Sequence, residues 1–183
     1  SNMPDFSLKN HQCVLDIGAH IGVFSRYAIS QGCQHIIAYE PEPSNFDLLR
    51  QNLDILQSSR NHPMIELHSA AVSNDAAARI LVQARNENDG KQNTWRHSLE
   101  QHSQYVDRET KMSSTKQLNK LQRFEVNCVS FFGGALAPGV TFVKIDCEGA
   151  ELDILLSDEV RQSSSWLDVT HLVFEWSFTK ERR

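Results

Sequence analysis

Short apolar runs alternate with amphipathic segments through the first third of the chain, and this alternation restricts the possible folds more than any other feature. Runs at 13–17 (CVLDI), 35–39 (HIIAY) and 64–68 (MIELH) predict strands. The segments between them, 22–30 and 43–57, carry apolar residues at helical spacing. Strands joined through a helix run parallel, because the crossover returns the chain to the same edge. The sequence therefore predicts an α/β fold, with a parallel sheet covered by helices.

The rest of the chain continues this pattern, with one interruption. Uninterrupted valine and isoleucine runs fit strands that are buried on both faces of a sheet. By the same criteria of composition and spacing, we expect strands at 79–83, 123–131, 140–146 and 171–176, and a helix near 150–156.

The interruption, 84–120, is polar and has few apolar anchors. An irregular stretch of this length is unusual inside a compact domain. We expect an insertion that is either partly helical and packed over one face or a mobile lid. A chain of 183 residues suits one domain, so a single domain over 3–183 is expected to contain this insertion.

The composition is that of an ordinary globular protein and argues against several classes of partner. Hydrophobic residues make up 40% and charged residues 22% of the chain, and the net charge is −5. The negative charge argues against nucleic acid or an anionic membrane as partner. No apolar run approaches the ~20 residues of a membrane helix, and the first residues lack an apolar leader. The four cysteines form no CxxC pair, so we expect a cytoplasmic protein without disulfides.

A glycine loop, DIGAHIG, follows the first predicted strand from Asp16 to Gly22. Glycine after a strand lets the backbone approach a ligand closely, and amide groups at the start of the next helix suit anionic groups. The Gly-x-x-x-Gly spacing is not the Gly-x-Gly-x-x-Gly of nicotinamide dinucleotide sites.

Glu40 ends the second strand, about 20 residues on, where an acidic residue takes ribose hydroxyls in nucleotide-binding units. The alternative for the glycine loop is a purely structural turn, and the alternative for Glu40 is a solvated loop carboxylate.

Four blocks of the chain resemble the FkbM family of S-adenosylmethionine-dependent methyltransferases. They are VLDIGAHIGVFS, AYEPEPSNFDLLRQNL, ELHSAAVS and FVKIDCEGAEL, and the resemblance covers 13–82 and 123–175. It implies a Rossmann-like class I methyltransferase fold, a three-layer αβα sandwich with a mostly parallel sheet of order 3-2-1-4-5. It also implies S-adenosylmethionine as cofactor.

The resemblance assigns residues to that cofactor. The glycine loop would surround the methionine part, Glu40 would bind the ribose, and the segment after the third strand would border the adenine. The family usually has asparagine where His20 stands. The expected cofactor-binding residues are Asp16, Gly18, Ala19, His20, Gly22, Glu40, Pro41, Ser69, Ala70, Ala71 and Asp146.

Three carboxylates are expected at the same edge of the sheet. Asp146 and Glu148 follow a buried strand, and Glu175 lies in the final strand. In such a sheet the strand order reverses beside the first strand, and a ligand crevice opens at that point. Any of the three can be the base that takes a hydroxyl proton, or can hold a divalent cation, although no residue pattern indicates a dedicated metal site. In the alternative interpretation, Glu148 stabilises the next helix N-terminus and Lys144 neutralises Asp146.

Two departures from the family concern acceptor recognition. The chain stops at FTKERR, where the fold generally carries two more strands, and 127–140 (NCVSFFGGALAPGV) lacks the family's usual pattern. We expect either a truncated domain that lacks C-terminal strands or a sheet completed by a partner, including a homo-oligomer.

The resulting hypothesis is a methyltransferase that acts on a hydroxyl of a small molecule or sugar. A nicotinamide-dependent oxidoreductase and a noncatalytic cofactor-binding module are the alternatives. The expected partner is a small-molecule acceptor, with neither nucleic acid nor membrane.

Overall fold

The computed structural model describes most of the chain. The described residues are 8, 11–55, 63–85, 92–99, 121–158, 166 and 168–175.

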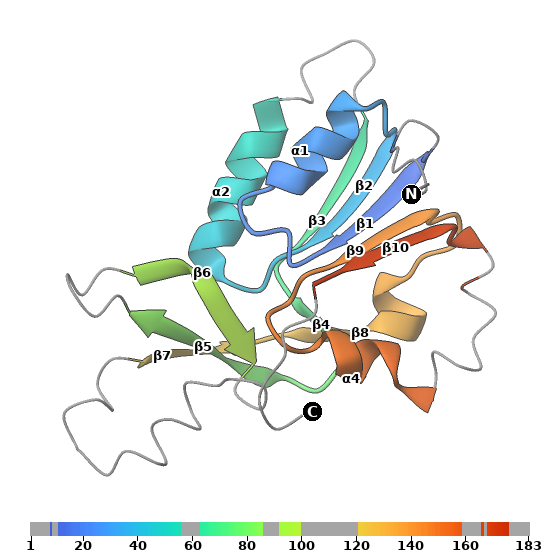
Figure 1. Cartoon of the computed structure of the whole chain (residues 1–183). Helices are drawn as coiled ribbons and strands as arrows, with labels where there is room; N and C mark the ends of the chain where they lie inside the picture. The colour runs from blue at the N-terminus through green and yellow to red at the C-terminus, as the bar shows by residue number, and fades with distance from the viewer. Residues whose placement is uncertain are drawn as a thin grey trace, which may run out of the picture.

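A sheet of five parallel strands, in the order β10-β9-β1-β2-β3, forms the centre of the molecule (Figure 1). Its strands are β1 (Cys13–Ile17), β2 (His35–Tyr39), β3 (Met64–His68), β9 (Phe142–Ile145) and β10 (His171–Phe174). The predicted order 3-2-1-4-5 is confirmed, with β9 and β10 as its fourth and fifth strands. Completion of this sheet by a partner stays a prediction.

Successive apolar residues of the central strands alternate between two separate apolar cores, one on each face of the sheet. On one face, Val14 packs with Leu49 and Leu53. Leu15 and Ile17 point to the other face and pack with Phe131, among others. The sheet is therefore the middle layer of three.

Helices cover both faces of this sheet (Figure 1). The first face carries α1 (Val23–Ser30) and α2 (Pro43–Asp54), and the second carries the helical turn η5 (Phe131–Ala135) and α4 (Glu151–Leu155). Glu42 caps α2, because its carboxylate accepts the Asn45 amide at 2.6 Å. No helix in the described part of the chain combines the length and the apolar character needed to span a bilayer.

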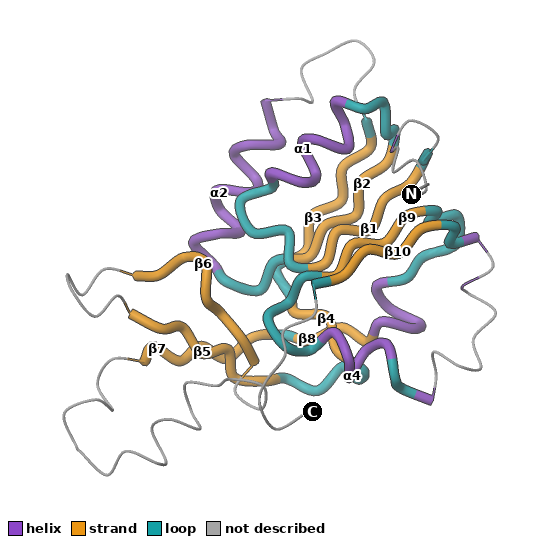
Figure 2. Tube along the Cα trace, in the orientation of Figure 1, coloured by secondary structure: helices purple, strands orange, loops and turns teal. Residues whose placement is uncertain are grey.

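Two smaller sheets lie beyond the carboxyl ends of the central strands (Figure 2). A parallel pair consists of β4 (Ala71–Ser73) and β8 (Cys128–Ser130). An antiparallel sheet of order β6-β5-β7 consists of β5 (Arg79–Arg85), β6 (Gln92–Leu99) and β7 (Leu121–Val126).

The predicted strand 123–131 is in fact two strands in different sheets. Its first part belongs to β7, its second part is β8, and Phe131 opens η5. The chain changes sheet at Asn127, whose carbonyl accepts the Ala71 amide at 2.9 Å. A run of apolar residues shows that strands are present, but it does not show with which strand each half pairs.

The predicted insertion also differs from expectation where it is described. Residues 92–99 form strand β6, which pairs with β5 through cross-strand partners such as Leu81 and Leu99. Residues 86–91 and 100–120 lie outside the described residues, so the lid stays a prediction.

Candidate functional site

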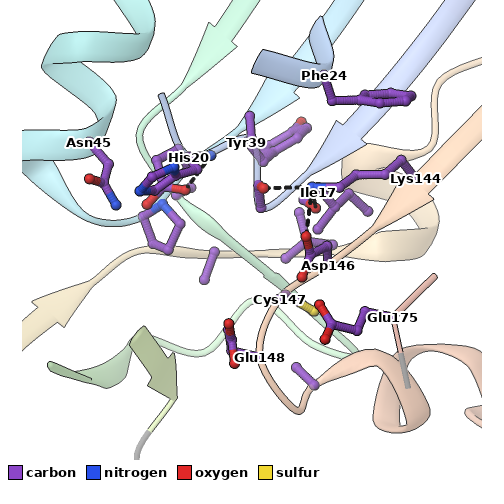
Figure 3. Close-up of a pocket in the computed structure, with 18 of the residues that line it drawn as sticks. Ile17, His20, Phe24, Tyr39, Asn45, Lys144, Asp146, Cys147, Glu148 and Glu175 are labelled. Atoms are coloured by element: carbon purple, nitrogen blue, oxygen red, sulfur yellow. Dashed lines mark hydrogen bonds and ion pairs between the residues drawn. The ribbon is translucent and has the colours of Figure 1, made fainter. Parts of the chain in front are cut away.

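A cavity of about 640 Å³ opens at the carboxyl ends of the central strands (Figure 3). Loops that follow β1, β2, β3, β9 and β10 line it, together with α1 and the antiparallel sheet. This is the size of a typical small-molecule site, at the position where parallel α/β sheets bind ligands.

The structure brings most of the predicted site residues together at this cavity. Those that line it are Gly18, Ala19, His20, Glu40, Pro41, Ala70, Ala71, Asp146, Glu148 and Glu175. Asp16, Gly22 and Ser69 are absent from its lining.

Asp16 does not line the cavity, but it contacts Lys144, which does. Its carboxylate is fully buried, with Oδ2 accepting the Ser25 hydroxyl at 2.7 Å and Oδ1 lying 3.2 Å from Lys144 Nζ. Asp16 and Lys144 are direct partners on β1 and β9, so the ion pair joins the two strands where the order reverses. Asp16 is thus fully buried beside Lys144, and its predicted direct contact with a cofactor stays a prediction.

Lys144 connects the two loops that flank the cavity. Its ammonium donates to the Gly18 carbonyl at 2.7 Å and lies 3.5 Å from Asp146 Oδ2 (Figure 3). Burial disfavours the ammonium, but Asp16 and then Asp146 outweigh this effect, and the pKa of Lys144 is raised above its usual value. The predicted placement of Lys144 and Asp146 on one side of the strand is therefore confirmed.

Gly18 is required by close packing between these loops. It has φ +74°, and a Cβ at this position would lie 1.9 Å from the Asp146 carbonyl oxygen. Gly22, with φ +87°, precedes α1, and a Cβ there would lie 2.7 Å from Leu49 of α2. Both glycines are therefore needed for the shape of the loop and the packing of α2.

Amides of the glycine loop bond within the protein. The Gly18 and Ala19 amides donate to the Tyr39 carbonyl at 3.0 and 2.9 Å, and the His20 amide donates to Glu40 Oε2 at 2.9 Å. These three amides are therefore not available to an anionic group, and binding of such a group by amides at the start of α1 stays a prediction.

Glu40 lies between the loop and the cavity. It is 5% exposed, and its Oε1 accepts the Glu42 amide at 2.9 Å while Oε2 accepts the His20 amide. Burial raises the pKa of Glu40 to about 7, against the opposing effect of these amides. The Asn45 side chain also bonds to Glu40. A carboxylate has about four acceptor positions, so Glu40 can still accept a hydroxyl group of a ligand in the cavity.

Asp146 and Glu175 form a carboxyl pair at the ends of β9 and β10. The Glu175 amide donates to the Ile145 carbonyl at 3.0 Å, which extends the pairing of these strands as far as Glu175. Hydrogen bonding to Asp146, followed by repulsion from its charge, raises the pKa of Glu175. The Asp146 side chain is 38% exposed, so this pair can exchange a proton with a ligand.

Glu151 was not identified from the sequence, although it holds the loop that carries Glu148. It is 3% exposed, and its two oxygens accept the Cys147 amide at 2.8 Å and the Gly149 amide at 2.9 Å. Glu148, which lies between Cys147 and Gly149 in the chain, has φ +55°, which is unusual for a residue other than glycine. One sequence feature could have identified Glu151: it is an acidic residue in the first turn of a predicted helix, a position that favours hydrogen bonds to nearby amides.

Side chains of the antiparallel sheet were also missed. Leu81 and Leu99 line the cavity. Leu99 is an apolar residue inside the stretch that composition identified only as polar. Within the described residues, no group of three or more His, Cys, Asp or Glu side chains is arranged to hold a metal ion.

Comparison with known proteins assigns the family. The family model described as "Methyltransferase FkbM domain" matches residues 16–183. The chain belongs to the FkbM methyltransferase family. The match includes the glycine loop, Glu40 and the Asp146 loop, all of which border the cavity.

Two individual proteins with methyltransferase names are similar to this chain. Methyltransferase 1 of Beauveria bassiana (strain ARSEF 2860) is 25% identical over 151 residues, which is 80% of this chain and 59% of that protein. The chain thus spans less than two thirds of the length of this relative. The crystal structure of methyltransferase FkbM from Methylobacillus flagellatus KT aligns with a TM-score of 0.48 and 16% identity, covering 82% of this chain and 29% of the other.

Proposed function

We propose that the cavity binds S-adenosylmethionine and that the protein transfers its methyl group to a hydroxyl of a small molecule or sugar. The observation that carries this proposal is one continuous cavity with a buried carboxylate, Glu40, after β2 and a carboxyl pair, Asp146 and Glu175, after β9 and β10. Membership of a methyltransferase family supports this function over the nicotinamide-dependent alternative.

The residues present fit this cofactor. Glu40 is a buried acceptor suited to a ribose hydroxyl. Pro41, Ala70 and Ala71 give an apolar surface suited to an adenine ring. Asp146 and Glu175 supply negative charge that suits a sulfonium.

When bound, S-adenosylmethionine supplies a methyl group that is already activated for displacement, so positioning of the acceptor provides much of the acceleration. Asp146 takes the proton of the acceptor hydroxyl on a carboxylate oxygen. Lys144 holds Asp146 in place through an ion pair, with Nζ 3.5 Å from Oδ2. The carboxyl groups of Asp146 and Glu175 already share one proton through their hydrogen bond, so Glu175 releases a proton to solvent when Asp146 takes up the new one. Glu148 and Glu175, which also line the cavity, are the other candidate bases.

Two measurements test the proposal. Calorimetry with S-adenosylmethionine tests binding, and transfer of labelled methyl to a small-molecule extract, followed by identification of the product, tests the reaction. Binding together with a labelled O-methyl product would support both parts. Binding without transfer to any acceptor would favour the noncatalytic module, and absence of binding would refute the proposal.

A further inference from the structure

The antiparallel sheet reaches the cavity through one cross-strand pair. Leu81 on β5 and Leu99 on β6 are direct register partners, and both line the cavity. They are nevertheless only 2% and 4% exposed, because they pack with Ala71 and Ala150 in one apolar cluster. Their side chains thus form a fixed, recessed part of the wall.

The strand order places this wall beside the segment that follows β3. Glu175 and Asp146 follow β10 and β9 on one side of β1, whereas Glu40 and Ala70 follow β2 and β3 on the other side. Ala71, which touches the leucine cluster, comes directly after this second group and begins β4. The leucine pair therefore adjoins the segment after β3 through Ala71, and it also adjoins the loop after β9 through Ala150.

We propose that Leu81 and Leu99 form part of the surface that binds the adenine ring, so that the antiparallel sheet is a component of the cofactor site. This inference rests on the proposed function, namely that the cavity binds S-adenosylmethionine. A flat, uncharged ring gains free energy when apolar side chains remove its faces from water. Pro41, Ala70 and Ala71 are short side chains, and the two leucines add the bulk that they lack.

Val126 provides a matched control. It lies on β7 of the same antiparallel sheet, belongs to the same cluster and is 6% exposed, but it is absent from the cavity lining. Truncation of any of these three residues to alanine leaves a hole in the cluster and destabilises the fold. Only truncation of the leucines should change ligand binding.

The experiment measures the affinities of adenosine, S-adenosylmethionine and S-adenosylhomocysteine for Leu81→Ala, Leu99→Ala and Val126→Ala, each first shown to be folded by circular dichroism. The three ligands share the adenine ring, so each leucine variant should weaken all of them by a similar factor, about 5- to 30-fold. Val126→Ala should stay within about twofold of the parent protein. Leu81→Val and Leu99→Val, which remove less volume, serve where an alanine variant does not fold.

Unchanged affinity for all three ligands in folded leucine variants would overturn the inference. So would a loss confined to the two methionine-containing ligands, because the leucines would then border the methionine part. A parent protein that binds none of the three ligands would instead overturn the proposed function on which the inference rests.

Discussion

Two loops flank the cavity, and each is held in an unusual backbone conformation by a different carboxylate. Loop 18–22 follows β1 and loop 146–149 follows β9, and each contains a left-handed residue that is not glycine, His20 at φ +52° and Glu148 at φ +55°. Such backbone conformations persist only where surrounding contacts determine them. In the first loop the buried carboxylate of Glu40 accepts the His20 amide, and in the second loop that of Glu151 accepts the amides of Cys147 and Gly149, on either side of Glu148.

The difference lies in where the holding carboxylate points. Glu40 faces the cavity while it holds His20 and Glu42, whereas Glu151 holds Cys147 and Gly149 and is absent from the cavity lining. The first loop is thus fixed by a group that can also bind a ligand, and the second by a group with only a structural role. We therefore expect binding to depend on the first loop and proton transfer on the second.

The largest effect is expected from Asp146→Asn, which keeps the shape of the side chain and removes its charge. If Asp146 is the base, the transfer rate should fall by about 10²–10⁴ while cofactor affinity changes little. Single-turnover kinetics and calorimetry would separate these quantities. Near-normal turnover at saturating cofactor would remove Asp146 from this role, and the same substitution to the amide at Glu148 and Glu175 would then identify the base.

Gly18→Ala should disrupt the contact between the two loops. The added Cβ would meet the Asp146 carbonyl, and φ +74° is unfavourable for alanine, so the free energy of unfolding should fall by about 3–5 kcal/mol. Gly32→Ala is the control, because Gly32 has φ +99° but open space around its Cα, and it should cost only about 1–2 kcal/mol. Equal losses in urea denaturation would show that packing between the loops contributes nothing.

Glu151→Gln should loosen loop 146–149, because an amide side chain offers one acceptor oxygen where two backbone amides need partners. The free energy of unfolding should fall by about 1–3 kcal/mol, the usual cost of a buried group left unpaired. Amide hydrogen exchange at Cys147 and Gly149 should accelerate more than at Gly18. Unchanged exchange in this loop would contradict the structural role given to Glu151.

Glu40 should make ligand affinity depend on pH. Its pKa of about 7 in the free protein lies above the ordinary 4.5, so its burial lowers stability increasingly as pH rises from 4.5 through 7. Ribose hydroxyls donate to the ionised carboxylate, so adenosine affinity should rise about tenfold between pH 6 and pH 8. Glu40→Gln should abolish this rise, and it leaves fewer amides unpaired than alanine would. A pH-independent affinity in the parent protein would exclude Glu40 from ribose binding.

The smallest effect is expected from His20→Asn. Asparagine tolerates the left-handed region better than histidine, so the free energy of unfolding should increase by about 0.5–1 kcal/mol. The His20 amide, which Glu40 holds, is unchanged by this substitution. A loss of stability measured by thermal unfolding would mean that the imidazole itself makes contacts that outweigh the backbone strain.

Much of the central architecture could be predicted, because it follows from local pattern. The strands at 13–17, 35–39 and 64–68 have the predicted bounds, since each is a short run rich in apolar residues that is followed by a polar or turn residue. The antiparallel sheet could not be predicted in the same way. Residues 92–99 are mostly polar, and their pairing with β5 depends on a partner that no local signal identifies.

Local pattern in the sequence determined the parallel sheet, and the resemblance to the FkbM family implied its strand order. Together they group Glu40, Asp146 and Glu175 at one edge, because the carboxyl ends of parallel strands meet at the same edge of a sheet. Only the tertiary structure decided what each side chain does there. Asp16 and Gly22 belong to the same motif as Gly18, yet Asp16 is buried against Ser25 and Lys144, and Gly22 makes room for α2. The physical reason is that a hydrogen bond or a steric contact depends on distances between segments far apart in the chain, and residue order does not fix those distances.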